Sequence, residues 1–303
     1  MKLPMKTILY LMTLLCGAFP VLADSLKQAG ATVTTHAESY AFTEGPAEAP
    51  DGKIYFSDIP NQRIHVYDPA TGKITVHREN SGRANGLMFD KDGALLACEG
   101  GNRIFTRQLG DTITPLAETF EGKKFNSPND VDIDDEGGMY FTDPRYGNRD
   151  DMEMKVEGVY YLRKGGQPIR IIDSLVRPNG VILSNDRKTL YVDDNGDQKI
   201  WAYDVQSDGS VKNGRMLVDL KTVKAGGGDG MTMDDQGNIY LAGNGHVFAF
   251  APDGKLIEKI AFPESPANCT FGGPDRKTLF ATARKGFYSI PMNVRGRKTV
   301  FDK

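Results

Sequence analysis

Six oxygen-bearing side chains occupy equivalent places along this chain. They are Glu44, Asn85, Asn129, Asn179, Asp229 and Asn268. Each lies 11 or 12 residues before an aromatic residue or leucine in a short apolar segment, and these later residues are Tyr55, Leu96, Tyr140, Tyr191, Tyr240 and Phe280. The set combines two carboxylates with four carboxamides. If the fold repeats with the sequence, these six side chains converge on one point.

Converging carboxylates repel each other unless a cation lies among them. An all-oxygen set suits a hard cation, and flexible coordination favours Ca²⁺ over Mg²⁺. The set has no thiolate and no paired imidazole, which makes Zn²⁺ a weaker candidate. The alternative interpretation is that these residues only shape the turn into a strand, as Asn and Asp often do. Glu44 fits that alternative poorly, because Glu is not a turn former.

A divalent cation held by such oxygens supports hydrolysis of an ester or lactone, because it polarises the carbonyl group and stabilises the oxyanion. Asp229 is the candidate catalytic residue. It would act as a base towards water, although a bound cation lowers the pKa of a carboxylate and weakens it as a base. It could instead attack directly as a nucleophile. The sequence leaves both roles open, and Glu44 is expected to be a ligand alone.

The six later residues mark a repeat that predicts how these side chains are positioned. Their spacings are 41, 44, 51, 49 and 40 residues, and each belongs to a turn followed by a short strand, as in Asp51-Gly52-Lys53-Ile54-Tyr55-Phe56. A period of 40 to 50 residues with strand-rich content is typical of a β-propeller with four strands per blade. Six repeats therefore predict an all-β, six-bladed propeller in a single domain, residues 24–303.

In such a fold the first strand of each blade lies innermost, and the six polar residues begin these strands. The second strand runs antiparallel to the first, so the loop that leaves it borders the same mouth of the axis. This geometry makes Asp143, Arg145 and Tyr146 candidate substrate contacts. The alternative is that these are ordinary solvated loop residues. A strand-like stretch, residues 31–35, is expected to complete the last blade and close the ring.

Composition and the N-terminus limit the classes of protein. The 303 residues carry 37 Lys and Arg against 40 Asp and Glu, a net charge of −3, which argues against a nucleic-acid-binding surface. Residues 1–23 combine Lys2 and Lys6 with an apolar run and a Val21-Leu22-Ala23 cleavage pattern. This pattern predicts a secretory signal peptide, and hence a periplasmic or secreted protein with no membrane contact after cleavage. Of the remaining cysteines, Cys98 and Cys269 are expected to be buried thiols.

At this point the sequence resembles the senescence-marker-protein/gluconolactonase family, also called regucalcin-like, and in particular its bacterial lactonases. The resemblance runs from about residue 42 to the C-terminus. The motifs that carry it are Phe42-Thr43-Glu44-Gly45-Pro46, Phe125-Asn126-Ser127-Pro128-Asn129-Asp130, Tyr140-Phe141-Thr142-Asp143-Pro144-Arg145-Tyr146-Gly147, Arg177-Pro178-Asn179-Gly180 and Gly228-Asp229-Gly230-Met231.

The resemblance implies a divalent metal on the axis, with Glu44, Asn129, Asn179 and Asp229 as its ligands. It also implies that Asn85 and Asn268 support these ligands or contact the substrate. Some relatives carry an arginine where this chain has Ser127, with Lys124 nearby as another candidate contact, so the sugar preference is left open. Ca²⁺ is the expected metal, with Zn²⁺, Mn²⁺ and Mg²⁺ as alternatives.

The expected activity is hydrolysis of a sugar lactone or related ester. Two alternatives remain at this stage. One is hydrolysis of organophosphates or aryl esters at the same site. The other is a propeller that binds a ligand or a protein without catalysis, with the cation as a structural element. The oligomeric state is not predictable from the sequence.

Overall fold

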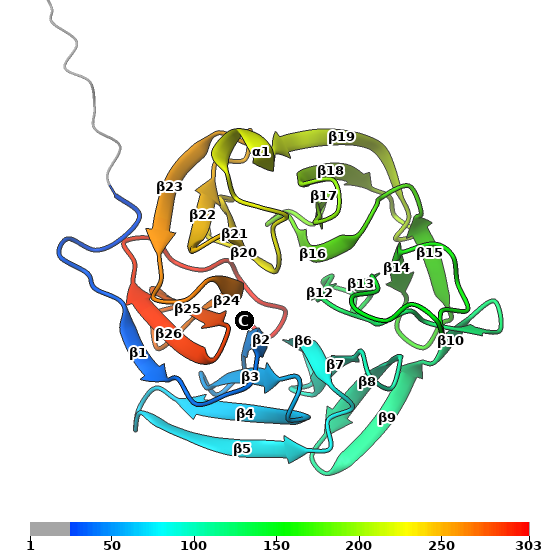
Figure 1. The fold of residues 1–303 in the computed structure, drawn as a ribbon, viewed down its shortest axis with the longest axis horizontal. Helices are drawn as coiled ribbons and strands as arrows, with labels where there is room; N and C mark the ends of the chain where they lie inside the picture. Colours follow the sequence, from blue (N-terminus) through cyan, green and yellow to red (C-terminus); the bar gives the residue numbers. More distant parts are fainter. Residues whose placement is uncertain (1–24, 303) are drawn as a thin grey trace, which may run out of the picture.

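The computed structural model describes residues 25–302, so the predicted signal peptide of residues 1–23 lies outside the described residues. Six four-stranded antiparallel sheets surround a central axis (Figure 1). The predicted six-bladed β-propeller is confirmed. Each of the six repeat residues from Tyr55 to Phe280 lies in the second strand of its blade, as expected.

The strands follow the chain from blade to blade. Blade 1 contains β2 (Thr43–Glu48), β3 (Ile54–Asp58), β4 (Arg63–Asp68) and β5 (Lys73–Glu79). Blade 2 contains β6 (Ala84–Phe89), β7 (Leu95–Glu99), β8 (Ile104–Leu109) and β9 (Thr112–Ala117). Blade 3 contains β12 (Val131–Ile133), β13 (Met139–Asp143), β14 (Gly158–Leu162) and β15 (Pro168–Ile172), preceded by a small hairpin of β10 (Thr119–Phe120) and β11 (Lys123–Lys124).

The second half of the ring repeats this plan. Blade 4 contains β16 (Pro178–Leu183), β17 (Thr189–Asp194), β18 (Lys199–Val205) and β19 (Val211–Asp219). Blade 5 contains β20 (Met231–Met233), β21 (Ile239–Gly243), β22 (His246–Phe250) and β23 (Leu256–Ala261). Within residues 25–302 the only helix is α1 (Leu220–Val223), a single turn after β19, and no helix there is long and apolar enough to cross a membrane.

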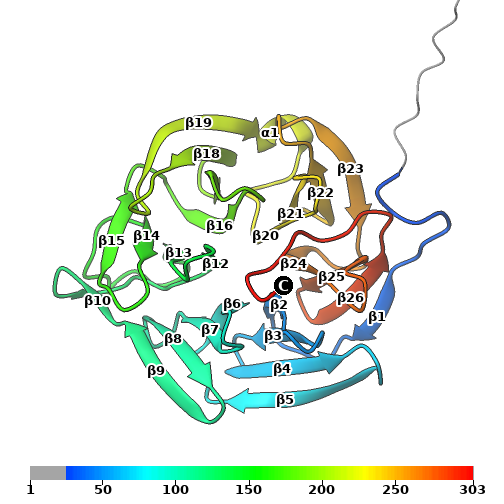
Figure 2. The same ribbon diagram turned by 180° about the vertical axis from the view of Figure 1, so that it is seen from behind.

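The N-terminal strand closes the ring. Blade 6 combines β24 (Pro266–Gly272), β25 (Thr278–Ala283) and β26 (Gly286–Pro291) with β1 (Thr34–Ala37), which pairs antiparallel with β26. Figure 2 shows β1 beside β26 at the outer edge of this blade. The predicted closure is therefore confirmed. The strand begins at Thr34 rather than Ala31, because Ala31 and Val33 pack against the core of this blade before pairing starts.

Aromatic rings pack the blades against one another. Phe56 of blade 1 stacks on Phe287 of blade 6 with ring centroids 4.5 Å apart, and Phe105 of blade 2 stacks on Phe141 of blade 3 at 5.3 Å. Such rings bury large apolar areas and lock neighbouring blades in one orientation. Cys98 and Cys269 are buried free thiols, as predicted.

Around the axis, the first strand of each blade contacts the first strands of both neighbouring blades. The innermost positions of these strands therefore form a closed ring. The C-terminal segment, residues 292–302, leaves blade 6 and ends close to the axis (Figure 1). One end of the axis thus stays open, and the other is crossed by this segment.

Candidate active site at the open mouth of the axis

Five of the six predicted polar residues line one cavity of about 800 Å³ at the mouth of the axis. They are Glu44, Asn85, Asn129, Asn179 and Asp229, one from each of five blades. Glu44, Asn129 and Asn179 are buried, whereas Asp229 keeps an accessible surface towards the cavity. The repeat spacing therefore predicted which side chains meet at the axis.

Glycine follows four of the six axial residues, and the crowding of the inner strands explains why. A Cβ atom on Gly45 would lie 2.0 Å from the carbonyl oxygen of Asn85 in the next blade. A Cβ on Gly180 would lie 2.4 Å from the carbonyl oxygen of Asp229. Real side chains do not approach a backbone so closely, so glycine is required where the blades meet at the axis. The axial side chains are brought together by these small neighbours.

The two axial carboxylates lie close together, with Glu44 buried and Asp229 partly exposed to the cavity. Burial raises the pKa of Glu44 to about 7, even though its Oε2 accepts a 2.9 Å hydrogen bond from the backbone N–H of Gly45. Burial and the nearby charge of Glu44 raise the pKa of Asp229 well above its usual range. Two buried carboxylates resist ionising together unless a cation lies beside them. The pair is therefore electrostatically suited to a cation.

Asn179 is oriented so that its oxygen is left unused. Its Nδ2 donates a 2.8 Å hydrogen bond to the hydroxyl of Tyr146. Its Oδ1 is buried and has no hydrogen-bond partner among residues 25–302. A buried polar atom without a partner is costly, so it needs an explanation such as a bound ion. The donors at this mouth thus fit a hard cation.

The types of side chain at the mouth argue against a zinc site. Among residues 25–302 there is no group of three or more His, Cys, Asp or Glu side chains arranged to hold a metal. Of the five axial residues at the mouth, two are carboxylates and three are carboxamides. Such a mixture suits Ca²⁺ better than Zn²⁺.

Asp143 does not contact the cavity, which corrects the predicted substrate role. It is fully buried at the end of β13, where its two oxygens accept hydrogen bonds from the backbone N–H groups of Asn126 and Ser127 at 2.8 and 2.7 Å. Burial raises its pKa to about 7. Asp58 and Asp194 bind the loops before Glu44 and Asn179 in the same way. These carboxylates at the strand ends hold the loops that lead to the axial residues.

Arg145 and Tyr146 line the cavity, as predicted. Lys124 does not. It is exposed on the β10–β11 hairpin, and its backbone rather than its side chain makes contacts, with Glu153 and Arg103. The structure thus corrects its expected role, because the hairpin extends away from the axis (Figure 1).

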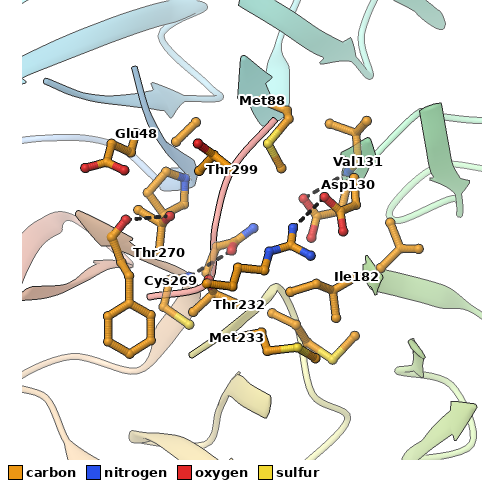
Figure 3. A pocket seen from close by; sticks show the side chains of 18 of the residues that line it. Glu48, Met88, Asp130, Val131, Ile182, Thr232, Met233, Cys269, Thr270 and Thr299 are labelled. Carbon is orange, nitrogen blue, oxygen red and sulfur yellow. Dashed lines mark hydrogen bonds and ion pairs between the residues drawn. The ribbon is translucent and has the colours of Figure 1, made fainter. Parts of the chain in front are cut away.

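Asn268 also lies outside the mouth cavity. Its Oδ1 accepts a 2.8 Å hydrogen bond from the backbone N–H of Cys269, and the residue lines a separate cavity of about 70 Å³ further along the axis. Figure 3 shows this inner cavity with Asp130, Thr232 and Cys269 around it. Its location speaks against a substrate contact, and the other expectation, that Asn268 supports the metal ligands, stays a prediction.

Several cavity residues were missed by the sequence reasoning. Arg83, Arg103 and Asn195 line the mouth but lie outside the aligned repeat positions. Arg83 precedes Asn85 by two residues, so its closeness to a predicted axial residue was the available signal.

Asp193 is fully buried near the end of β17, and neither of its oxygens has a hydrogen-bond partner within residues 25–302. A Cβ on Gly228 would lie 2.3 Å from its Oδ1, which places it beneath the turn that carries Asp229. At the matching position of blade 3, Thr142 donates a 2.6 Å hydrogen bond to the carbonyl oxygen of Asn179. Asp193 is thus placed to support the Asp229 turn rather than to face the cavity.

Comparison with known proteins gives one consistent family. A family model described as the SMP-30/Gluconolactonase/LRE-like region matches residues 42–285. A gluconolactonase of Zymomonas mobilis is 31% identical over 292 residues, which cover 86% of this chain and 81% of that protein. Regucalcin of Xenopus laevis is 29% identical over 81% of this chain and 84% of its own. A diisopropyl-fluorophosphatase of Loligo vulgaris is 28% identical over 79% of this chain and 84% of its own.

Solved structures agree with the fold. A gluconolactonase of Xanthomonas campestris superposes with a TM-score of 0.82 at 29% identity, covering 88% of this chain and 91% of that one. A calcium-binding regucalcin of Agrobacterium tumefaciens has a TM-score of 0.75 at 21% identity, covering 89% and 95% of the two chains. At that identity the second likeness concerns the fold alone.

Proposed function

The chain belongs to the SMP-30/gluconolactonase/LRE-like family of lactonase-like hydrolases, and on that premise we propose that it hydrolyses a sugar lactone at a divalent cation held at the open mouth of the axis. The observation that carries this proposal is the buried Asn179 Oδ1 without a partner, beside the close carboxylates of Glu44 and Asp229. Neighbouring oxygens without hydrogen-bond or ion-pair partners are suited to bind a ligand, and they contribute little to packing.

Glu44, Asn129, Asn179 and Asp229 would hold the cation. Two carboxylates with two carboxamides favour Ca²⁺, with Mg²⁺, Mn²⁺ and Zn²⁺ as alternatives. When bound, the cation would supply Lewis-acid polarisation of the lactone carbonyl and electrostatic stabilisation of the oxyanion.

Asp229 is the residue that we propose for the chemical step, because it is the axial carboxylate with an accessible surface in the cavity. As a base it takes a proton from water, the oxygen of that water bonds to the carbonyl carbon, and the ring C–O bond breaks as the proton passes to the ring oxygen. As a nucleophile its carboxylate oxygen bonds to the carbonyl carbon, and the ring C–O bond breaks as water gives a proton to the ring oxygen; the hydroxide left then opens the resulting anhydride at the Asp229 carbonyl. Both routes yield the hydroxy acid. Single turnover in ¹⁸O-water followed by mass analysis separates them, since only the nucleophile route labels Asp229.

Other residues would orient the substrate. Tyr146 holds the amide of Asn179 through a 2.8 Å hydrogen bond, which fixes the direction of Oδ1. Asn85 and Ser127 offer hydrogen-bonding groups on the cavity wall, which suit the hydroxyl groups of a sugar. Because Asp143 binds the backbone of the loop that carries Ser127, this part of the wall is held in place before substrate arrives.

A substrate panel tests the proposal. We expect the chain comprising residues 24–303 to release acid from D-glucono-1,5-lactone above the spontaneous rate, and to act more weakly on aryl esters and on diisopropyl fluorophosphate. The second candidate, an organophosphate hydrolase, is favoured by the 28% identity to the Loligo vulgaris diisopropyl-fluorophosphatase. Faster turnover of the phosphorus compound would select it. No turnover of any compound by the folded protein would leave the binding propeller without catalysis.

We also propose that the protein is exported, on the pattern of residues 1–23. N-terminal sequencing of the protein purified from the producing cells is expected to begin at Asp24. A first residue before Asp24 would contradict cleavage after Ala23.

A further inference from the structure

Three arginines line the mouth cavity, but only one of them has a guanidinium group without a partner. Arg103 donates to the carbonyl oxygens of Phe125 and Asp151, and Arg145 to that of Asn126. Both also pair with the carboxylate of Asp151. The guanidinium of Arg83 makes no hydrogen bond or ion pair within residues 25–302. Arg103 and Arg145 thus brace the loops, whereas Arg83 is available to a ligand.

Arg83 is an exposed residue at the rim of the mouth cavity, and its stem is supported by a neighbouring loop. A Cβ on Gly101 would lie 2.8 Å from Cδ and 2.9 Å from Cγ of Arg83, so the stem of the arginine lies flat on a residue with no side chain. The backbone N–H of Gly101 also donates a 2.9 Å hydrogen bond to the carbonyl of Gly82. The guanidinium therefore reaches the same cavity as Glu44 and Asp229.

A second arginine, Arg284, lines a cavity that adjoins the mouth and shares Phe42 and Asp229 with it. Arg284 lies over the ring of Phe42 with a separation of 5.8 Å, and it lines the adjoining cavity with Asp229. Its side chain also has no hydrogen bond or ion pair in the described part of the chain, and its charge offsets a small part of the rise that burial causes in the pKa of Asp229. The open mouth thus carries two available positive charges, although the whole chain has a net charge of −3.

From this geometry we propose that the lactone substrate carries an anionic group, a carboxylate or a phosphate remote from the reacting carbonyl, and that Arg83 binds it. This inference rests on the proposed lactonase function. A neutral sugar is served by the amide and hydroxyl groups of Asn85 and Ser127 and gains little from an unpaired guanidinium. A guanidinium presents a fork of donors that matches the two oxygens of a carboxylate or phosphate. Arg83 therefore selects the charged substrate among lactones of similar shape.

The test compares three lactones that differ in charge. D-Glucono-1,5-lactone is neutral, D-glucaro-1,4-lactone carries a carboxylate, and 6-phospho-D-glucono-1,5-lactone carries a phosphate. We expect the wild-type protein to prefer one charged lactone by at least about tenfold in kcat/KM, the range of a hydrogen bond to a charged group. Which of the two is preferred distinguishes carboxylate from phosphate.

The variants test whether Arg83 is the cause. Arg83→Met is expected to lower the ratio of charged to neutral kcat/KM about tenfold, and Arg83→Lys to lower it less, because lysine keeps the charge without the fork. Arg215→Gln is the matched control, since Arg215 is an exposed arginine on the outer strand of blade 4, and its ratio is expected to equal that of the wild type. An equal ratio in wild type and Arg83→Met, or no preference in the wild type, would overturn the inference.

Binding of acids separates this inference from the proposed function. If no lactone is hydrolysed, the lactonase proposal fails, and calorimetry with D-gluconate, D-glucarate and 6-phospho-D-gluconate still decides the role of Arg83. The inference requires glucarate or phosphogluconate to bind more tightly than gluconate, and requires this difference to shrink in Arg83→Met. Equal binding of the three acids, or a difference that persists in Arg83→Met, would overturn it.

Discussion

The two ends of the propeller axis are built from the same six inner strands but treat their polar groups differently. At the open mouth, Glu44 and Asp229 share a cavity of about 800 Å³, and the Oδ1 of Asn179 is left without a partner within residues 25–302. At the other end, the C-terminal segment crosses the axis, and Arg297 donates to Asp132 at 2.6 Å and to the carbonyl of Leu183 at 2.7 Å.

The closed end pairs its charges. Asp132 is almost fully buried and also accepts the backbone N–H of Leu183, so its oxygens are satisfied. Arg276 joins Glu48 to Asp302 and thereby ties the C-terminal segment to blade 1. Figure 3 shows this segment running past Thr299 over the inner cavity. The comparison indicates that charge pairing stabilises the closed end, whereas polar groups are kept unpaired at the mouth for binding and chemistry.

The largest expected effect is on the chemistry at the mouth. Asp229→Asn removes the proposed base or nucleophile while keeping an oxygen ligand. We expect kcat/KM for a lactone to fall about 10³-fold, within the range for loss of a catalytic acid–base group. The measurement pairs lactone kinetics with metal analysis of the same sample. Full activity at unchanged metal content would show that Asp229 is not catalytic.

At the closed end, the expected effect is on stability instead. Arg297→Met leaves Asp132 buried without its cation, which typically costs about 3 kcal/mol. Urea unfolding of the metal-loaded protein should report this loss, with Arg297→Lys intermediate, while kcat/KM stays within about threefold. A large loss of activity at unchanged stability would contradict the view that the closed end serves stability and the open mouth serves chemistry.

Glu44→Gln is expected to weaken cation binding. The substitution preserves shape but removes one of the two negative charges, and we expect Ca²⁺ affinity to fall about tenfold to a hundredfold, equivalent to about 1.4 to 2.8 kcal/mol. Titration with Ca²⁺ by calorimetry measures this directly. Unchanged affinity would place the cation away from the axial set.

The axial carboxylates, Glu44 and Asp229, predict how pH changes the stabilisation of the fold by a bound metal ion. Folding raises the pKa of Glu44 from 4.5 to about 7, so the native metal-free chain binds this proton more tightly than the unfolded chain does. Its stability should therefore fall as the pH rises from about 4.5 to about 7. A bound cation replaces the proton, so Ca²⁺ should raise Tm more at pH 8 than at pH 5.

Thermal unfolding with chelator or Ca²⁺ across this pH range tests the prediction. The pKa of Asp143 is also raised to about 7, but this residue lies away from the cation and contributes equally with and without it. The difference between the two conditions therefore reports the axial pair. A difference in Tm that does not vary with pH would contradict the role of Glu44.

The smallest expected effect is that of Tyr146→Phe. It removes the hydroxyl that accepts the hydrogen bond from Asn179 and leaves the ring in place. The loss of one such bond corresponds to about 1 kcal/mol, so kcat/KM should fall about fivefold. Steady-state kinetics check it, and a loss as large as that of Asp229→Asn would mean that Tyr146 acts in the chemical step.

The fold was predictable because every blade contains the same local sequence pattern of a turn followed by a short strand. The turn before Tyr55 and the strand that follows recur around the ring, so spacing alone predicted the number of blades and the second strands. The axial set was predictable for the same reason, since Glu44, Asn179 and Asp229 occupy one place in that repeat. Ring closure by β1 followed from the strand-like stretch before blade 1, with its start misplaced by three residues.

For the loop residues around the mouth, a role at the site depends on whether the side chain faces the cavity. The sequence repeat does not encode that orientation. Asp143 and Arg145 lie two residues apart, yet one binds backbone N–H groups beneath the loop and the other lines the cavity. Lys124 is close in sequence to Asn129, but the hairpin that carries it points outward. Arg83 lies two residues before Asn85, but its support by Gly101, eighteen residues later, is a contact between loops that the repeat does not encode.

The most direct test is to remove the metal and then return it. It asks whether the unpaired oxygens at the mouth form a metal-dependent lactonase site. The wild-type protein would be chelated, assayed on D-glucono-1,5-lactone against the spontaneous rate, and reassayed after addition of Ca²⁺, Mg²⁺, Mn²⁺ or Zn²⁺ in turn. We predict that activity disappears on chelation and returns with one equivalent of a divalent ion. Ca²⁺ is the ion that we expect to restore it best. Lactone hydrolysis that survives complete removal of metal would contradict this prediction.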